Sequence, residues 1–326
     1  MKSRKFGSLD WRVTEIGFGA WAIGGGWGAQ SDADSLEALR RFIELGGDFI
    51  DTAQGYGNGR SEQLIGTVLK ERGAGPRVVV ATKIPPAAGS WPPSPYDSMS
   101  ECFGERYLRE RVERSLTALR TECLDLVQLH TWTRAWNADP QPLLTLRRLQ
   151  QEGKLRAVGL SSPEHDQNAV LGPMRAGLVD AVQVIYNIFE QEPQAEIFPT
   201  ALARGTAVIV RVAFDESSLT GKLTAATRFP ADDFRSRYFA GDRLERTVAR
   251  VAAIRKELGA DEPDLAVAAL KFALKPEAVS VVIPGIRTVR QAELNLAVGN
   301  QPSLDDALER RLRRHQWRRS DWYKGK

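Results

Sequence analysis

The sequence of 326 residues is 42% hydrophobic and 26% charged, and its 45 Lys and Arg residues exceed its 41 Asp and Glu residues by a net charge of +4. No apolar run approaches the ~20 residues of a membrane-spanning helix, and two cysteines, Cys102 and Cys123, are too few for a disulfide scaffold or a cysteine-based metal site. Because no signal-peptide-like segment follows the basic N-terminus, we expect a cytoplasmic protein with free thiols, no membrane contact and no metal.

The chain opens with a predicted hairpin over residues 4–16 and then alternates apolar strands with amphipathic helices. The predicted strands are short and rich in Val and Ile, and they cover residues 16–19, 49–51, 78–83, 124–130, 157–160, 181–185, 207–212 and 279–283. The predicted helices cover residues 35–45, 61–71, 105–119, 142–151, 167–175, 193–204, 264–274 and 288–297, with an extra helix at 243–258. Short, continuous apolar strands are typical of parallel strands that are buried on both faces.

Eight strand–helix units predict an α/β fold of the (β/α)₈ barrel class, the TIM barrel. No linker-like segment divides the chain, so we expect one barrel domain over residues 1–326. Two connections, 84–101 and 214–242, are longer than usual. Both follow a strand, which places them at the C-terminal face of the barrel, where they can cover a site.

A glycine-rich segment after the first barrel strand has the spacing of a dinucleotide-binding motif. Gly17, Gly19 and Ala22 fit the G-x-G-x-x-G/A pattern, but that motif requires a helix to begin within it. The sequence continues with Ile-Gly-Gly-Gly-Trp-Gly, which cannot start a helix. We therefore exclude a Rossmann fold and expect this backbone to approach a ligand closely. Trp21 and Trp27 would supply aromatic walls, although a packing role fits Trp27 equally well.

Ionisable residues lie at the ends of three predicted strands. Asp51 ends the second strand, Lys83 the third and His130 the fourth, and Tyr56 lies in the glycine-rich loop after Asp51. Taken singly, Asp51 and Lys83 fit a buried ion pair, and His130 fits a core histidine. Charged groups at the ends of apolar strands are costly unless they have partners or a role, and the four together predict a catalytic site.

These four residue types suit proton transfer at a carbonyl group. Tyrosine has a pKa of about 10, and we expect the ammonium of Lys83 to lower the pKa of Tyr56 while Asp51 holds Lys83 in place. His130 would orient the carbonyl oxygen through a hydrogen bond or relay a proton. Tyr56 would then give a proton to the carbonyl oxygen as hydride reaches the carbon.

The stretch Asp51-Thr-Ala-Gln-Gly-Tyr56-Gly, with Lys83 and His130 at later strand ends, resembles the aldo-keto reductase family, and the resemblance covers nearly the whole chain. It implies that the catalytic tetrad of that family falls on Asp51, Tyr56, Lys83 and His130. It also implies reduction of an aldehyde or ketone with NADP(H), preferred over NAD(H), extended across the mouth of the barrel.

The resemblance further implies residues around the nicotinamide. Ser161 and Ser162 fall where the family commonly holds the carboxamide with Ser-Asn, so Ser162 is a departure with fewer hydrogen-bonding groups. Gln183 matches the third carboxamide ligand. Arg211 stands where a tyrosine often stacks on the nicotinamide. A guanidinium can also stack on a ring, or it can meet a substrate anion or the cofactor phosphates, which makes Arg211 a candidate determinant of specificity.

The segment from Gly285 to Asn295 resembles the adenosine-phosphate site of the family. A phosphate there would meet free amides at the start of the last helix, and Arg287 would form charge-assisted bonds to the 2′-phosphate. Gln291 and Asn295 share a helix face suited to the adenine edge, with a solvated helix face as the alternative. The remaining positions implied for the cofactor are Gly19, Trp21, Gly221 and Lys222, the last two in the loop that covers the pyrophosphate.

Aromatic side chains on the loops at the barrel mouth are the expected walls of the substrate pocket. They are Trp27, Trp91, Tyr96, Trp132 and Phe214. This many aromatic residues favours an apolar or ring-shaped substrate, although the same side chains could instead pack against one another.

Two alternatives for function stay open. An alcohol or sugar dehydrogenase would use the same tetrad in the oxidative direction, since Tyr56 as phenolate is the matching base. A non-catalytic NADPH-binding subunit that senses redox state is disfavoured by the intact tetrad. The basic cluster at 310–319 suggests nucleic-acid binding, but it is also typical of a helix end, where the helix dipole favours cations. No second basic patch with interleaved aromatic residues supports nucleic-acid binding. We expect a small-molecule partner and no nucleic acid, and the sequence predicts no oligomeric state.

Overall fold

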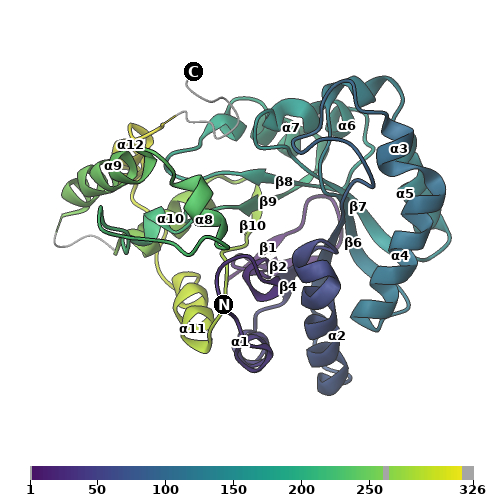
Figure 1. Cartoon of the computed structure of the whole chain (residues 1–326), viewed down its shortest axis with the longest axis horizontal. Coiled ribbons are helices and arrows are strands. Elements are labelled where there is room, and N and C mark those ends of the chain that lie inside the picture. The colour runs from purple at the N-terminus through teal and green to yellow at the C-terminus, as the bar shows by residue number, and fades with distance from the viewer. Residues whose placement is uncertain (1, 260–263, 318–326) are drawn as a thin grey trace.

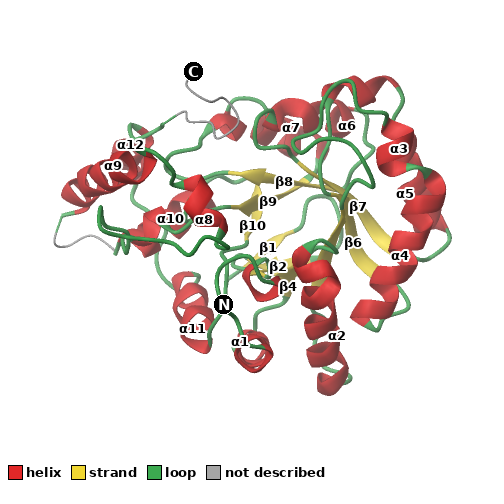
Figure 2. Cartoon of the chain, viewed as in Figure 1, coloured by secondary structure: helices red, strands yellow, loops and turns green. Residues whose placement is uncertain are grey.

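The computed structural model of the chain describes residues 2–259 and 264–317. A two-stranded antiparallel hairpin, β1 (Ser3–Lys5) and β2 (Arg12–Thr14), confirms the predicted opening of the chain. Parallel strands follow at the centre of the molecule, and helices surround them (Figure 1, Figure 2).

The eight parallel strands form one sheet in which neighbours follow the order of the chain. They are β3 (Phe18–Gly19), β4 (Phe49–Asp51), β5 (Val79–Ile84), β6 (Leu124–Leu129), β7 (Leu155–Ser161), β8 (Ala181–Ile185), β9 (Ala207–Arg211) and β10 (Val279–Val282). Isolated parallel bridges join Ile16 to Val282 and Gly19 to Gly285, so the first and last strands meet and close the sheet. The predicted (β/α)₈ barrel is confirmed.

Helices cover the outside of the barrel between successive strands. The main ones are α1 (Asp32–Glu44), α2 (Arg60–Arg72), α4 (Glu105–Leu119), α5 (Gln141–Gln151), α6 (Leu171–Arg175), α7 (Ile197–Arg204), α10 (Leu265–Leu274) and α11 (Val289–Val298). The predicted extra helix is α9 (Arg243–Leu258), and three short helices are α3 (Met99–Phe103), α8 (Phe234–Tyr238) and α12 (Asp306–Arg313). The start of α1 follows from local chemistry, because the Ser31 side chain accepts a hydrogen bond from the N–H group of Asp34.

Two predicted helices are shorter than the sequence pattern indicated. Residues 167–175 form a 3₁₀ turn, η4 (Gln167–Val170), before α6, and the helix predicted over 193–204 forms η5 (Glu192–Gln194) before α7. Proline lacks a backbone N–H group and is tolerated only in the first turn of a helix. Pro173 and Pro199 lie in the first turns of α6 and α7, so each α-helix begins just before its proline.

Apolar side chains are buried on both faces of the sheet, because neighbouring residues of a strand point to opposite faces. The inner cluster contains Phe49, Ala81 and Leu126 from the strands together with Phe6 and Trp11 from the hairpin. The hairpin therefore closes the N-terminal end of the barrel. A second, larger cluster lies between the strands and the helices.

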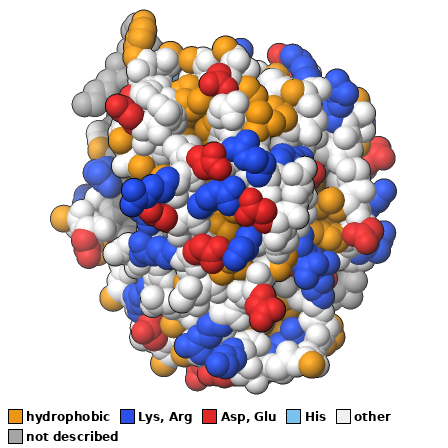
Figure 3. All heavy atoms as spheres, turned by 90° about the vertical axis from the view of Figure 1, so that its right-hand side faces the viewer, with side chains coloured by type: hydrophobic (Ala, Val, Ile, Leu, Met, Phe, Trp, Pro, Cys, Tyr) orange, Lys and Arg blue, Asp and Glu red, His pale blue; other side chains and the backbone are white. Residues whose placement is uncertain are grey.

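The outer surface over α4 and α5 carries interspersed charges of both signs (Figure 3). Arg109 contacts both Glu105 and Glu152 there, and Lys154 contacts Glu113. Within residues 2–259 and 264–317, no helix combines the length and apolar composition that crossing a bilayer requires.

The basic cluster at the C-terminus belongs in part to α12. Arg310, Arg311 and Arg313 lie in the last turn of that helix, where cations are favoured by the helix dipole. Arg318 and Arg319, which complete the cluster in the sequence, lie outside the described residues.

Candidate active site

Polar side chains form the top layer of the barrel interior. Each of them lies two residues after a member of the inner apolar cluster, so the alternation of the strand points both side chains inward. Phe49 is followed in this way by Asp51, Ala81 by Lys83, Leu126 by Gln128, Ala181 by Gln183 and Ile209 by Arg211. The same periodicity therefore produces an apolar floor and a polar layer at the C-terminal mouth, where barrel sites are built.

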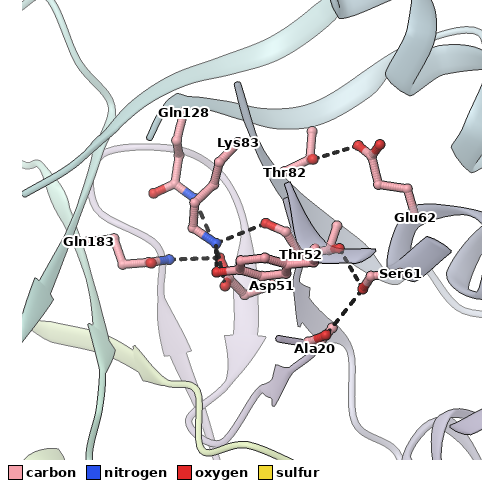
Figure 4. A network of polar contacts seen from close by, with 10 residues as sticks. Ala20, Asp51, Thr52, Ser61, Glu62, Thr82, Lys83, Gln128 and Gln183 are labelled. Atoms are coloured by element: carbon pink, nitrogen blue, oxygen red, sulfur yellow. Dashed lines mark hydrogen bonds and ion pairs between the residues drawn. The ribbon is translucent and has the colours of Figure 1, made fainter. Parts of the chain in front are cut away.

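Lys83 is the centre of this layer (Figure 4). Its Nζ atom lies 2.6 Å from Asp51 Oδ2, 2.8 Å from the carbonyl oxygen of Thr52 and 3.1 Å from the hydroxyl of Tyr56. The side chain is fully buried. The other two acceptors, Asp51 and Thr52, therefore hold the ammonium directly beside the Tyr56 hydroxyl.

Asp51 is itself held by amides from two further strands. Gln183 Nε2 donates to Asp51 Oδ1 over 2.7 Å, and Gln128 Nε2 lies 3.5 Å from the same oxygen (Figure 4). Gln183, expected at the nicotinamide carboxamide, also lines the cavity described below. Gln128 was not predicted, although its position two residues before His130 in a strand could have indicated it. A Cβ at Gly159 would lie 2.8 Å from Gln128 Cγ, so a glycine leaves room for this side chain.

Tyr56 begins the 3₁₀ turn η2 (Tyr56–Gly59), in which Gly57 and Asn58 have positive φ angles of 61° and 53°. The turn packs closely on the glycine-rich loop after β3. A Cβ built on Gly24 would lie 2.6 Å from the carbonyl carbon and 2.8 Å from the Cβ of Tyr56. Only glycine at position 24 allows Tyr56 this placement, and neither residue spacing nor composition indicated that contact.

Protein surroundings control the protonation of Tyr56 and Lys83. Burial raises the pKa of Tyr56 above its ordinary value, and the opposing effect of the Lys83 ammonium is smaller. The expectation that Lys83 sets a lowered pKa for Tyr56 is therefore wrong in net direction, although the effect of Lys83 itself has the expected sign. Burial acts to lower the pKa of Lys83, but the nearby Asp51 carboxylate and Tyr56 outweigh it and the net shift is upward. Both groups therefore hold their protons at neutral pH.

His130 lies beside Tyr56. Its ring centroid is 5.8 Å from that of Tyr56 and 5.4 Å from that of Trp91, with edge-to-face geometry in both cases. Burial, followed by the charges of Lys83 and Arg211, lowers the pKa of His130 well below its ordinary value. The imidazole is therefore neutral at neutral pH and suited to hydrogen bonding.

A single cavity of about 1510 Å³ joins the tetrad to the start of α11. Asp51, Tyr56 and His130 line one end, and Arg287 and Gln291 line the other. Such a volume exceeds the roughly 300–1,000 Å³ typical of drug-sized ligands, so it has room for an extended ligand together with a small one.

The cavity brings together most of the residues implied for a cofactor. Those that line it are Gly19, Trp21, Ser161, Gln183, Arg211, Lys222, Gly285, Arg287, Gln291 and Asn295. Ser162 and Gly221 do not line it. The Ser162 side chain lies 3.4 Å from Gln167 Oε1, and the Gly221 carbonyl accepts a hydrogen bond from Arg255.

Arg211 and Arg287 have definite partners. Arg211 Nη2 forms a 3.1 Å ion pair with Glu164 and donates to the carbonyl oxygen of Ser162. The Arg287 guanidinium donates to Gln30 Oε1 and to the carbonyl oxygens of Trp27 and Ala29, at distances of 2.6–2.9 Å. All of these acceptors of Arg287 are neutral, so its charge is not cancelled by them.

Three of the expected aromatic walls, Trp27, Trp91 and Phe214, line the cavity. Trp132 does not, because it is fully buried in the outer apolar cluster, where it packs on Trp136 and donates to Asn137. Tyr96 does not either, since it is 96% exposed on the loop after β5. The position of an aromatic residue near a strand end therefore did not indicate whether its side chain lies in the core, at the surface or in the pocket wall.

Arg235 is a cavity-lining residue that the sequence did not indicate. Its guanidinium lies 4.4 Å from the ring centroid of Trp27 and pairs with Asp233. The N–H group of Phe234 also donates to the carbonyl oxygen of Gly26. The long segment after β9 thus contacts the glycine-rich loop after β3, a pairing that no local pattern encodes.

A closed barrel with an Asp–Lys–Tyr network and a histidine at its mouth is what the resemblance to an oxidoreductase family implies, and comparison with known proteins agrees. The sequence profile described as the Aldo/keto reductase family matches residues 15–315. The chain therefore belongs to the aldo/keto reductase family, whose members act on carbonyl and alcohol groups.

Relatives include both reductases and dehydrogenases by name. The chain is 32% identical to aldo-keto reductase YhdN of Bacillus subtilis over 235 residues, which cover 69% of this chain and 65% of that protein. It is 30% identical to the NADH-specific methylglyoxal reductase of Escherichia coli, over 69% of this chain and 71% of the relative. The solved glycerol dehydrogenase AKR11B4 of Gluconobacter oxydans is 27% identical, with a TM-score of 0.77 over 95% of this chain and 93% of that chain.

Proposed function

We propose that the chain is an NADPH-preferring carbonyl reductase that converts an aldehyde or ketone to an alcohol, with Tyr56 as the proton donor. The observation that carries the proposal is the position of Lys83 Nζ, 2.6 Å from Asp51 and 3.1 Å from the Tyr56 hydroxyl. Asp51 and Tyr56 line the same cavity as His130. This arrangement supplies a proton and the means to stabilise the anion left behind.

Two features of the cavity wall support binding of a phosphorylated dinucleotide. Asn295 Nδ2 is a buried donor on the cavity wall that has no partner among the described residues. A Cβ built on Gly285 would meet no atom within 4 Å, so this part of the wall is open. Ser161 and Gln183 would hold the nicotinamide, Arg287 would hold the 2′-phosphate, and a bound reduced nicotinamide supplies a hydride.

Each catalytic side chain has a separate task. Tyr56 is a phenol at neutral pH, because burial raises its pKa, and it can therefore donate a proton to a carbonyl oxygen. The Lys83 ammonium then stabilises the phenolate that forms beside it. Neutral His130 donates a hydrogen bond that orients the carbonyl, and Asp51 keeps Lys83 in place.

A second candidate is a dehydrogenase that oxidises an alcohol. The likeness to a glycerol dehydrogenase favours it. The raised pKa of Tyr56 favours reduction at neutral pH, because oxidation needs the phenolate as base. Preference for NADPH rests on Arg287, and the name of the Escherichia coli relative shows that NADH specificity also occurs among relatives.

Titration of intrinsic fluorescence with NADPH and NADH, followed by a panel of carbonyls and alcohols, tests the proposal. We expect tight binding of NADPH and turnover of at least one carbonyl. Tyr56→Phe should abolish turnover while leaving NADPH affinity unchanged. Loss of affinity together with turnover would show that the role of Tyr56 is misassigned, and selectivity for NADH would contradict the role of Arg287.

A further inference from the structure

Glu62 is a fully buried carboxyl group outside the tetrad, in the first turn of α2. Its Oε1 atom accepts a hydrogen bond from Thr82 Oγ1 over 2.6 Å (Figure 4). The same oxygen accepts a second hydrogen bond from Ser115 Oγ over 2.7 Å. Thr82 directly precedes Lys83 in β5, so this carboxyl lies behind the catalytic lysine. Its Oε2 atom is buried and has no partner among the described residues.

Gln54, in the loop that leads from Asp51 to Tyr56, belongs to the same cluster. Its Nε2 atom donates to the carbonyl oxygen of Arg111 over 2.6 Å and to Ser115 Oγ over 2.7 Å. The carbonyl oxygen can only accept, so it fixes which end of the amide is nitrogen. Ser115, having accepted from Gln54, gives its one proton to Glu62. Gln54 Oε1 is left buried with no partner among the described residues.

If Glu62 were a carboxylate, two buried oxygen atoms in one cluster would both lack a donor. Buried polar atoms without partners are rare because each loses its hydration without compensation. A carboxylic acid would supply the missing donor, since a carbonyl-type Oε1 accepts from Thr82 and Ser115 while Oε2–H becomes a donor. The Gln54 amide bonds to the same Ser115 hydroxyl as Glu62, which makes Gln54 Oε1 the candidate acceptor. No side-chain cation contacts the Glu62 carboxyl oxygens within the described residues.

We propose that Glu62 is protonated in the folded protein, that its Oε2–H group donates to Gln54 Oε1, and that it is thereby a positioning residue for the Tyr56 turn. The link to catalysis rests on the function proposed above, whereas the protonation does not. Gln54 also donates its backbone N–H group to the carbonyl oxygen of Lys83 over 3.1 Å. A Gln54 side chain that is held by the Glu62 acid therefore fixes the loop that runs from Asp51 to Tyr56.

The surroundings of Glu62 agree with a neutral acid. Burial is the largest influence and raises the pKa of Glu62, against the hydroxyl groups of Thr82 and Ser115. The charged groups that face it are Arg114 from α4 and Lys83 from β5, and both favour the ionised form more weakly.

Glu62→Gln provides a direct test, because a glutamine side chain has the donor and acceptor pattern of the protonated acid. At neutral pH only the wild type loses stability through the raised pKa of this carboxyl, so we expect Glu62→Gln to unfold at a temperature equal to or above that of the wild type. Glu62→Ala should unfold at a lower temperature. Infrared spectroscopy should show a protonated-carboxyl band at neutral pH in the wild type that is missing in Glu62→Gln. Glu37→Gln, an equal change at an exposed position of α1, should keep the band and the stability.

The pH dependence has a defined sign. A carboxyl group whose pKa is raised by folding stabilises the fold fully below the unfolded-state value of about 4.3, and this contribution declines as the pH rises. The stability of the wild type relative to Glu62→Gln should therefore fall with rising pH. A difference that grows with pH, no infrared band, or equal destabilisation by Gln and Ala would each overturn the proposal.

Activity provides a separate readout of positioning. Glu62→Ala should lower kcat by about tenfold to a hundredfold, since small displacements of a catalytic group have effects of that size. Glu62→Gln should recover most of that loss. If the wild type turns over no carbonyl, the reductase function fails while the infrared and stability results still decide the protonation of Glu62. If turnover is normal but both variants lose it equally, the positioning role fails alone.

Discussion

Replacing Lys83 with Met tests how the tetrad is held together. Methionine has a similar length and fits a buried site, but it removes the ammonium that contacts Asp51, Thr52 and Tyr56. Asp51 has only 4% of its side chain exposed, so it would become a buried carboxylate without a cation. The variant therefore separates the structural role of the ion pair from its role in catalysis.

The magnitude follows from burial and from the bonds that remain. Removing one partner of a buried ion pair costs about 3–5 kcal/mol in the free energy of unfolding. Asp51 keeps its 2.7 Å bond from Gln183, which places Lys83→Met near the lower end, at about 3 kcal/mol. Replacing both charges by neutral groups is often nearly neutral, so the double variant with Asp51→Asn should recover most of this loss. Loss of proton transfer should lower kcat by about a hundredfold or more in both variants.

Urea unfolding followed by circular dichroism measures the stability, and NADPH oxidation measures the activity. Lys70→Met, at an exposed position of α2, is the matched control and should change neither. A loss below about 1 kcal/mol for Lys83→Met, the size of an exposed ion pair, would refute the argument that this pair is buried and structurally coupled. A double variant no more stable than the single one would show that the cost lies elsewhere.

Three further predictions follow from the site. Burial raises the pKa of Tyr56, so the rate of carbonyl reduction should stay constant through neutral pH and fall only in alkaline solution. The rate of alcohol oxidation should instead rise with pH. A reduction rate that already declines at a pH below 7 would contradict this reasoning. Gly24→Ala should displace Tyr56 and lower kcat with NADPH affinity retained, whereas Gly55→Ala, whose added methyl meets no atom within 4 Å, should have little effect on kcat. Arg287→Met should weaken NADPH binding by about 10- to 100-fold in a fluorescence titration, because it removes charge-assisted hydrogen bonds. NADH binding should stay unchanged. Equal weakening of both cofactors would rule out a contact between Arg287 and the 2′-phosphate.

Periodicity and strand ends were enough to predict the barrel and the grouping of its polar residues. Asp51, Lys83 and His130 each follow an apolar strand, and parallel strands all end at one mouth, so their proximity could be predicted before any contact was known. Tyr56 was predicted from its loop and from the family resemblance. These features depend on local sequence and on the symmetry of the fold.

Other features depend on contacts between distant segments. The Gly24 contact with Tyr56, and the contacts of Arg287 with the carbonyl oxygens of Trp27 and Ala29, join separate loops and leave no local pattern. The net pKa of Tyr56 depends on how burial compares with the charge of Lys83, and composition does not contain that comparison. Trp132 was misplaced for the same reason, since burial in the core and exposure to a pocket give an aromatic residue similar sequence surroundings.

Charge is distributed unequally along the cavity, and this bears on what each end can bind. At the catalytic end, Lys83 is paired with Asp51 and Arg211 with Glu164, while His130 is neutral. At the other end, the acceptors of Arg287 are carbonyl and amide oxygens, which leave its positive charge available to a phosphate. Under the proposed function, we therefore expect charge to contribute to cofactor affinity at this end. At the catalytic end the paired charges favour an uncharged carbonyl that is held by hydrogen bonds, and such a substrate does not displace the Lys83 ammonium from the Tyr56 hydroxyl.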